Sequence, residues 1–117
     1  MIMSNSKKIL RIILREISDI YNTLTRFNCI SINVLESDID AKKSIAMSLI
    51  NISESVFALD SSFRDNNQNI NWGQFKRIRN ITAHKYGAIK WDIIWSIIHN
   101  ELILFTRQIN ELEQTTQ

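Results

Sequence analysis

The chain contains no proline and only two glycines, Gly73 and Gly87, in 117 residues. All-β folds need many tight turns, and turns favour glycine and proline because of their special backbone angles. Their scarcity therefore predicts a few long helices joined by few connections. The length suits a single domain with one core, and we expect this domain to span residues 1–117. Its tail, at about 113–117, is expected to be frayed.

Apolar residues recur at helical spacing in four segments. The first segment follows three N-cap candidates, Ser4, Asn5 and Ser6, and ends before a connection at 28–33. The second runs from near Ser37 to Phe63 and is followed by a polar loop at 64–69. The third starts around Asn71 and reaches Thr82, and the fourth runs from about Trp91 to Leu112. Four amphipathic helices with short connections predict an all-α, antiparallel four-helix bundle.

The last predicted helix has an unusually wide apolar surface. Ile93, Ile94, Ile97 and Leu104 lie beside its main apolar stripe. A small protein that exposes a large apolar patch usually covers it in an oligomer, so we expect a homodimer. A tightly packed core rich in isoleucine is the alternative explanation.

The composition argues against several classes of protein. Cys29 is the only cysteine, which rules out an intramolecular disulfide and, with only two histidines, leaves little basis for a zinc site. We expect no metal and no cofactor. No uncharged apolar run approaches the roughly 20 residues that span a bilayer, and the first residues do not resemble a signal peptide. A cytoplasmic protein without membrane contact is expected.

Positive charge is concentrated in one part of the chain. The net charge is only +2, but residues 66–91 contain no acidic residue. The basic residues of this window are Lys76, Arg77, Arg79, Lys85 and Lys90. Such a window attracts a nucleic-acid backbone electrostatically. It includes the stretch "RIRNITAHKYG", which differs from the isoleucine-rich segments around it.

Helix geometry limits how the polar residues of this stretch can meet. Asn80 and His84 are four residues apart and would share one helical face. Arg79 and His84 are five apart and would diverge by about 140° on a regular helix. They could still converge on one phosphate if the helix ended just before His84, or if two subunits shared the site across a two-fold axis.

The chemistry available in this stretch suits metal-free cleavage of RNA. Arginine binds phosphate oxygens through two hydrogen bonds, and histidine takes and returns a proton near neutral pH. The 2′-hydroxyl of RNA supplies the nucleophile, so the protein needs only a base and stabilisation of the phosphorane. Composition alone nevertheless favours a structural reading of His84, as a residue that caps helix carbonyls.

The stretch "RNITAHKY" resembles the Arg-x4-His motif, with a tyrosine two residues after the histidine, of the HEPN superfamily, and more narrowly its HepT-like members. The flanks "INWGQFKRIRN", "YGAIKWDIIWSII" and "SLINISESVFAL" are also similar, so the resemblance spans roughly 38–112. The chain departs from the family pattern at Ser53-Glu54-Ser55, where Gly-Glu-Ala is common, at Lys90, and after Leu102, where a proline is often found.

The resemblance implies an all-α HEPN bundle that dimerises so that two motifs face one cleft. It implies Arg79 and His84 as the catalytic pair, with Asn80 in support. Arg77 stands at an Arg-x6-His spacing, which the superfamily also permits. The partner would be a minimal nucleotidyltransferase antitoxin that uses ATP to transfer AMP onto Tyr86.

These observations predict a metal-independent endoribonuclease, the toxin of a type II toxin–antitoxin system. The RNA-binding residues would be Lys76, Arg77 and Lys85. One alternative is a non-catalytic module that binds a nucleotide or substrate for a partner nucleotidyltransferase. Another is a purely structural helical bundle whose motif is a charged helix end.

Overall fold

The computed structural model of the protein describes residues 2–83 and 88–117. Within these residues the chain forms seven helices and no strand, which confirms the all-α class. The helices are α1 (Asn5–Arg26), α2 (Ile32–Ser37), α3 (Ile39–Ala58), α4 (Ser61–Asp65), α5 (Gln74–Thr82), α6 (Trp91–His99) and α7 (Glu101–Thr115). The four-helix bundle and the homodimer stay predictions.

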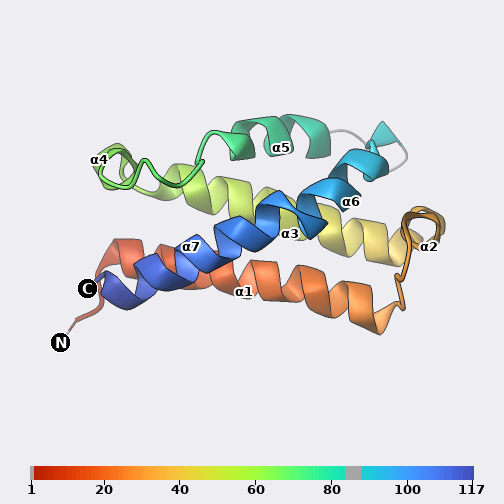
Figure 1. The fold of residues 1–117 in the computed structure, drawn as a ribbon, viewed down its shortest axis with the longest axis horizontal. Helices are drawn as coiled ribbons and strands as arrows, with labels where there is room; N and C mark the ends of the chain where they lie inside the picture. The colour runs from red at the N-terminus through yellow and green to blue at the C-terminus, as the bar shows by residue number, and fades with distance from the viewer. Residues whose placement is uncertain (1, 84–87) are drawn as a thin grey trace.

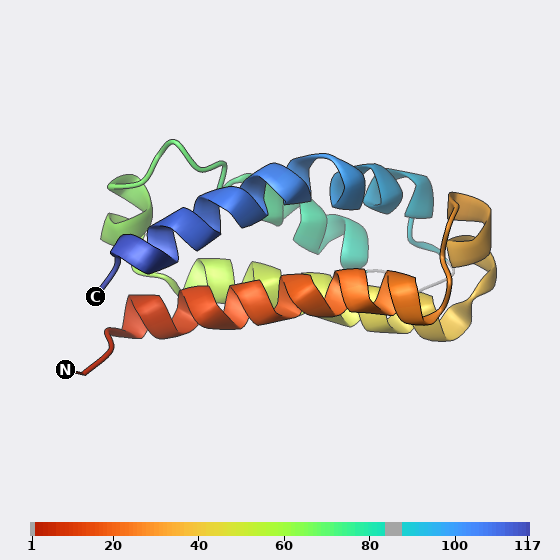
Figure 2. The same cartoon turned by 60° about the horizontal axis from the view of Figure 1, so that its bottom comes forward.

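Two long helices, α1 and α3, lie side by side and form the base of the fold (Figures 1 and 2). Helix α5 packs on α3, and α7 packs on α1. Helix α2 contacts α3 and α6 at one end of the molecule, whereas α4 lies at the other end together with both chain termini (Figure 1). Helix α3 therefore supports α5.

The core lies between these helices and is built largely from isoleucine, leucine and phenylalanine. The Phe75 and Phe105 ring centroids are 4.5 Å apart, and Trp72 meets Phe105 edge-on at 6.0 Å. These contacts join the start of α5 to α7. The hydroxyl of Tyr21 donates a 2.7 Å hydrogen bond to the Ile98 carbonyl and so links α1 to α6.

Polar caps start the two long helices close to where the sequence predicts. The side chain of Ser4 accepts the Lys7 N–H at 3.1 Å and begins α1. Asp38 accepts the N–H groups of Asp40 and Ala41, both at 3.1 Å, and begins α3. Each cap satisfies amide groups that have no partner within the first turn of a helix.

Two predicted boundaries need correction. The connection expected at 28–33 already contains the first residues of α2, because the Ser31 side chain caps a short helix there. The second predicted helix does not reach Phe63, because α3 ends at Ala58 and Leu59 adopts an extended conformation. Phe63 belongs instead to α4, which begins after Asp60.

The predicted helix from 91 to 112 is interrupted at Asn100, where φ is −129° and ψ is −84°. The side-chain amide of Asn100 donates to the Ser96 carbonyl at 2.8 Å. That carbonyl would accept the Asn100 backbone N–H in a regular helix, so the side chain replaces the helical bond and allows the break. Ile94 and Ile97 are fully buried in α6, whereas Leu104 is 53% exposed in α7. Part of the wide apolar surface is thus covered within one chain.

Most of the tail expected to fray, 113–117, is helical. Helix α7 continues to Thr115, and the Thr116 N–H donates to the Leu112 carbonyl at 3.0 Å. Glu113 pairs with Arg11 at 2.9 Å and with Lys7 at 3.6 Å. Contacts with α1, which the local sequence does not reveal, therefore hold the end of the chain.

None of the helices in the described ranges is long and apolar enough to cross a membrane.

Candidate nucleic-acid interface

Helix α5 presents most of the predicted site residues because its other face is buried. Phe75, Ile78 and Thr82 are buried, as their spacing predicts. Thr82 also donates its hydroxyl to the Ile78 carbonyl at 2.8 Å. The remaining face carries Lys76, Arg77, Arg79 and Asn80, all of them exposed. The buried stripe thus fixes the helix and turns its basic side chains outward.

Arg79 is positioned by an aromatic ring from α3. Its guanidinium carbon lies 4.4 Å from the centroid of the Phe57 ring, a cation–π contact. Arg79 forms no ion pair with any described residue. The contact therefore restricts the side chain without neutralising its charge, and the guanidinium hydrogen-bond donors remain available to an anion.

Arg77 lies on the opposite flank of α5. It stands two positions before Arg79, which places the two side chains about 200° apart around the helix axis. Its Nη2 atom is 3.6 Å from a carboxylate oxygen of Glu101, and both side chains are largely exposed. The two candidate catalytic arginines thus face different neighbours: Arg79 faces α3, and Arg77 faces the start of α7.

Asn80 and Lys76 are exposed on α5, and neither makes a side-chain hydrogen bond or ion pair with another described residue. Lys76 belongs to the basic surface of the helix. Asn80 stands next to Arg79 in the sequence, so its side chain projects from the helix about 100° away from that of Arg79.

His84, Lys85 and Tyr86 lie outside the described residues. What the structure gives is the end of α5: the helix stops at Thr82, and Ala83 is its C-cap. The divergence of about 140° between Arg79 and His84 assumes a regular helix through both positions. Since α5 ends before His84, this angle does not fix the relation between the two side chains, and their convergence on a phosphate stays a prediction.

Phe57 is the site residue that sequence reasoning missed. It is half-buried and packs beside the main apolar stripe of α3. Its role depends on which helix covers α3, and spacing along α3 does not contain that information. The stretch "SLINISESVFAL" includes Phe57, but its resemblance to the family gives this ring no role.

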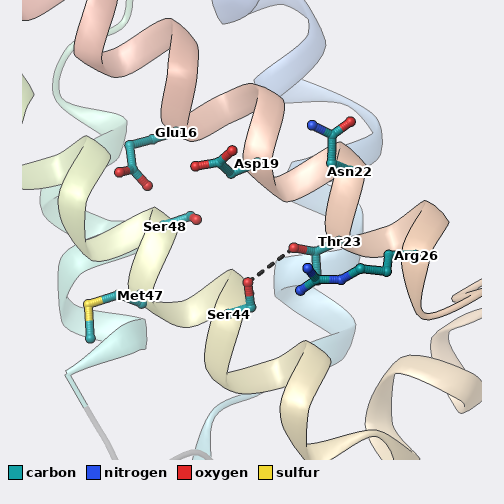
Figure 3. A pocket seen from close by; sticks show the side chains of 8 residues that line it. All are labelled: Glu16, Asp19, Asn22, Thr23, Arg26, Ser44, Met47 and Ser48. Carbon is teal, nitrogen blue, oxygen red and sulfur yellow. Dashed lines mark hydrogen bonds between the residues drawn. The ribbon is translucent and has the colours of Figure 1, made fainter.

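A separate polar hollow of about 470 Å³ lies between α1 and α3 (Figure 3). Glu16 and Asp19 supply carboxylates from α1, and the hydroxyls of Thr23 and Ser44 are 3.1 Å apart. None of the predicted site residues lines this hollow. Its two carboxylates would repel a phosphate, so it is a poor candidate for an RNA site.

Among the described residues, no group of three or more His, Cys, Asp or Glu side chains is arranged to hold a metal ion.

The described residues thus form an all-helical fold in which Arg79, near the end of a basic helix, has no ion-pair partner among them. The model of one family, described as ribonuclease HepT-like, matches residues 13–112. This match covers most of the chain, from within α1 to within α7, and the protein therefore belongs to the ribonuclease HepT-like family. No curated protein and no solved structure gives a significant match.

Proposed function

We propose that this protein is a metal-independent endoribonuclease that acts as the toxin of a type II toxin–antitoxin system. The observation that carries the proposal is Arg79: an exposed arginine without an ion-pair partner in the described ranges, held on Phe57, on a helix that ends just before His84. Membership of the ribonuclease HepT-like family supports the same activity.

The reaction needs few groups. His84 accepts the proton of a 2′-hydroxyl as the 2′-oxygen bonds to the adjacent phosphorus, and the bond from phosphorus to the 5′-oxygen then breaks. The proton returns to the departing 5′-oxygen, which leaves a cyclic phosphate on one product and a hydroxyl on the other. Arg79 stabilises the negative charge that develops on the phosphorane oxygens.

The other predicted site residues bind or position the substrate in this proposal. Asn80 supports the Arg79–His84 pair through its amide. Lys76, Arg77 and Lys85 attract the RNA backbone. A homodimer brings two copies of the motif to one cleft, so that groups from two subunits can act on one phosphate. The exposed apolar residues Ile103 and Leu104, at 48% and 53%, are consistent with further contacts of α7 in such a dimer.

Tyr86 is the proposed point of control. A partner nucleotidyltransferase would bring ATP, the tyrosine oxygen would attack the α-phosphorus, and pyrophosphate would leave while the phenolic proton is lost. The attached AMP places a bulky negative group two residues from His84, where it blocks the site and repels RNA. A Tyr86→Phe variant should take up no AMP from labelled ATP; labelling equal to wild type would refute this assignment.

RNA cleavage by the purified protein in the presence of a metal chelator tests the catalytic proposal. Wild type should cleave and leave cyclic phosphate ends, whereas His84→Ala should not. If His84→Ala cleaves as fast as wild type, the proposed role of His84 is wrong. If wild type binds RNA but never cleaves it, the non-catalytic binding module replaces the nuclease as the explanation.

A further inference from the structure

Two arginines from different helices meet at the Phe57 ring. Arg64, in α4, has its guanidinium carbon 5.8 Å from the ring centroid, and Arg79, in α5, has its own at 4.4 Å. Because both distances are measured to the same point, the two guanidinium groups cannot lie farther apart than their sum. Phe57 therefore brings together two positive charges that are 15 residues apart in the sequence.

Neither charge is neutralised by an acidic side chain among the described residues. The ion pairs of the described residues join Glu113 to Lys7 and Arg11, and Glu101 to Arg77. Arg64 and Arg79 take no part in them, so their mutual repulsion is not offset by a carboxylate contact. A bound anion would remove this repulsion.

Arg64 also carries an unused hydrogen-bond donor. Its Nε atom is buried and has no hydrogen-bond partner within the described ranges. A buried donor without an acceptor is unfavourable, and such an atom in a native structure calls for an explanation. The terminal amino groups of Arg64 are not among the buried, unpartnered atoms and make no hydrogen bond to a described residue, so an anion can approach them from solvent. A small shift of the side chain toward that anion would also bring Nε to an acceptor.

Arg64 lines a hollow of about 550 Å³ formed with the loop before α5. The other lining residues are Asp65, Gln68, Asn69, Ile70, Asn71, Trp72 and Gly73. Side-chain amides, which both donate and accept hydrogen bonds, dominate its polar wall and suit the hydroxyls and base edges of a nucleotide. Asp65 contributes the single carboxylate of this wall and weakens its attraction for phosphate without pairing with Arg64.

We propose that Arg64 binds a second phosphate of the RNA, next to the one held by Arg79, and that the strand continues from Phe57 into the hollow beside α4. The ligand is single-stranded RNA, recognised by its phosphates at the two arginines and by a nucleotide in the amide-lined hollow. This inference rests on the proposed ribonuclease function and extends its substrate site away from the motif.

The test is the salt dependence of binding to a short single-stranded RNA with 2′-O-methyl riboses, which lacks the nucleophile for cleavage. Fluorescence anisotropy at several salt concentrations gives the slope of log Kobs against log[salt]. Arg64→Ala should weaken binding about tenfold and make the slope shallower by about 0.7, the value for one lost phosphate contact on a single strand. Arg64→Lys, which keeps the charge, should restore most of the slope.

Arg26→Ala is the control, because Arg26 is likewise an arginine over a phenylalanine, 4.8 Å from the Phe27 centroid, but belongs to α1 and is exposed, whereas Arg64 is half-buried. It should leave the slope unchanged. A slope for Arg64→Ala equal to that of wild type, or an equal loss in Arg26→Ala, would overturn the inference. Thermal unfolding of each variant identifies any loss of RNA affinity that comes from misfolding. If Arg64→Ala is misfolded, the slope measured for Arg64→Lys decides whether the charge at position 64 contacts a phosphate.

The outcomes separate this inference from the proposed catalysis. If wild type cleaves unmodified RNA while Arg64→Ala binds the 2′-O-methyl strand as tightly as wild type, the nuclease proposal is supported and the Arg64 subsite is refuted. If wild type never cleaves RNA but the salt dependence of its RNA binding depends on Arg64, the Arg64 subsite is supported and the nuclease proposal is refuted.

Discussion

Arg79 of α5 and Phe57 of α3 are in direct contact, with 4.4 Å between the guanidinium carbon and the ring centroid. The contact joins the proposed catalytic arginine to the helix that supports α5. It also distinguishes Arg79 from Arg77, which is paired with Glu101 on the other flank.

This difference predicts unequal effects of two alanine substitutions on RNA cleavage. Arg79→Ala should lower kcat about a hundredfold or more, because a donor that stabilises the transition state is lost. Arg77→Ala should mainly weaken RNA binding, since its charge is already shared with Glu101. Single-turnover cleavage at saturating protein separates the two effects. The reverse order of rates would make Arg77 the catalytic arginine.

The Phe57 ring should affect binding through both arginines above it. Phe57→Leu keeps an apolar side chain but removes the cation–π contacts, each about 0.5–1 kcal/mol at an exposed site. RNA affinity should fall several-fold. Phe27→Leu, which removes the similar contact with Arg26, should leave RNA affinity unchanged. Anisotropy titrations of both variants provide the comparison, and equal losses would contradict a specific role for Phe57.

The cap of α3 should contribute measurably to stability. Asp38→Ala removes the acceptor of two N–H groups and should lower the free energy of unfolding by about 1 kcal/mol. Asp60, at the N-cap of α4, makes no side-chain cap hydrogen bond, so Asp60→Ala should have a smaller effect. Urea denaturation followed by circular dichroism measures both. Similar losses would show that the Asp38 hydrogen bonds contribute little.

Glu113 should make the docking of α7 on α1 sensitive to acid. Its hydrogen bond from Arg11 is the main reason that the pKa of the carboxyl lies below its ordinary value; burial opposes this effect and the charge of Lys7 adds to it. A carboxyl whose pKa is lowered on folding stabilises the protein above its unfolded-state pKa. That contribution is lost as the pH falls through the lowered folded-state pKa.

The stability difference between wild type and Glu113→Gln should therefore be present at neutral pH and shrink in acid. Denaturant titrations across this pH range measure it. Glu111→Gln is the control, because Glu111 is exposed on the same helix and forms no ion pair with the described part of the chain. A difference that stays constant from neutral pH into acid would show that the ion pairs do not cause the effect.

Much of the fold could be predicted from periodicity because burial of one helical face leaves a regular pattern. The buried positions Ile45, Leu49, Ile52 and Val56 recur at helical spacing in α3, and Phe75, Ile78 and Thr82 do so in α5. The errors fall where a single side chain changes the local hydrogen bonding. Asn100 interrupts a helix whose apolar pattern continues, and Ser31 starts a short helix within an expected connection.

The candidate site was predictable only in part. Arg79, Asn80 and the basic character of α5 follow from the order of residues, since neighbours on one helix have fixed angular relations. Arg64 lies at the edge of a segment expected to be a polar loop, and nothing in its spacing connects it with Arg79.

The sequence by itself determined that the chain is helical, that α5 carries an acid-free basic surface, and that Arg79 and His84 would point in different directions on one continuous helix. Tertiary structure decided that α5 ends before His84 and that Arg64 and Arg79 share Phe57. It also decided that Arg77 pairs with Glu101, whereas Arg79 has no ion-pair partner in the described part of the chain. Periodicity records which face of a helix is buried. It does not record which distant helix covers that face, and that pairing is what places two arginines at one ring.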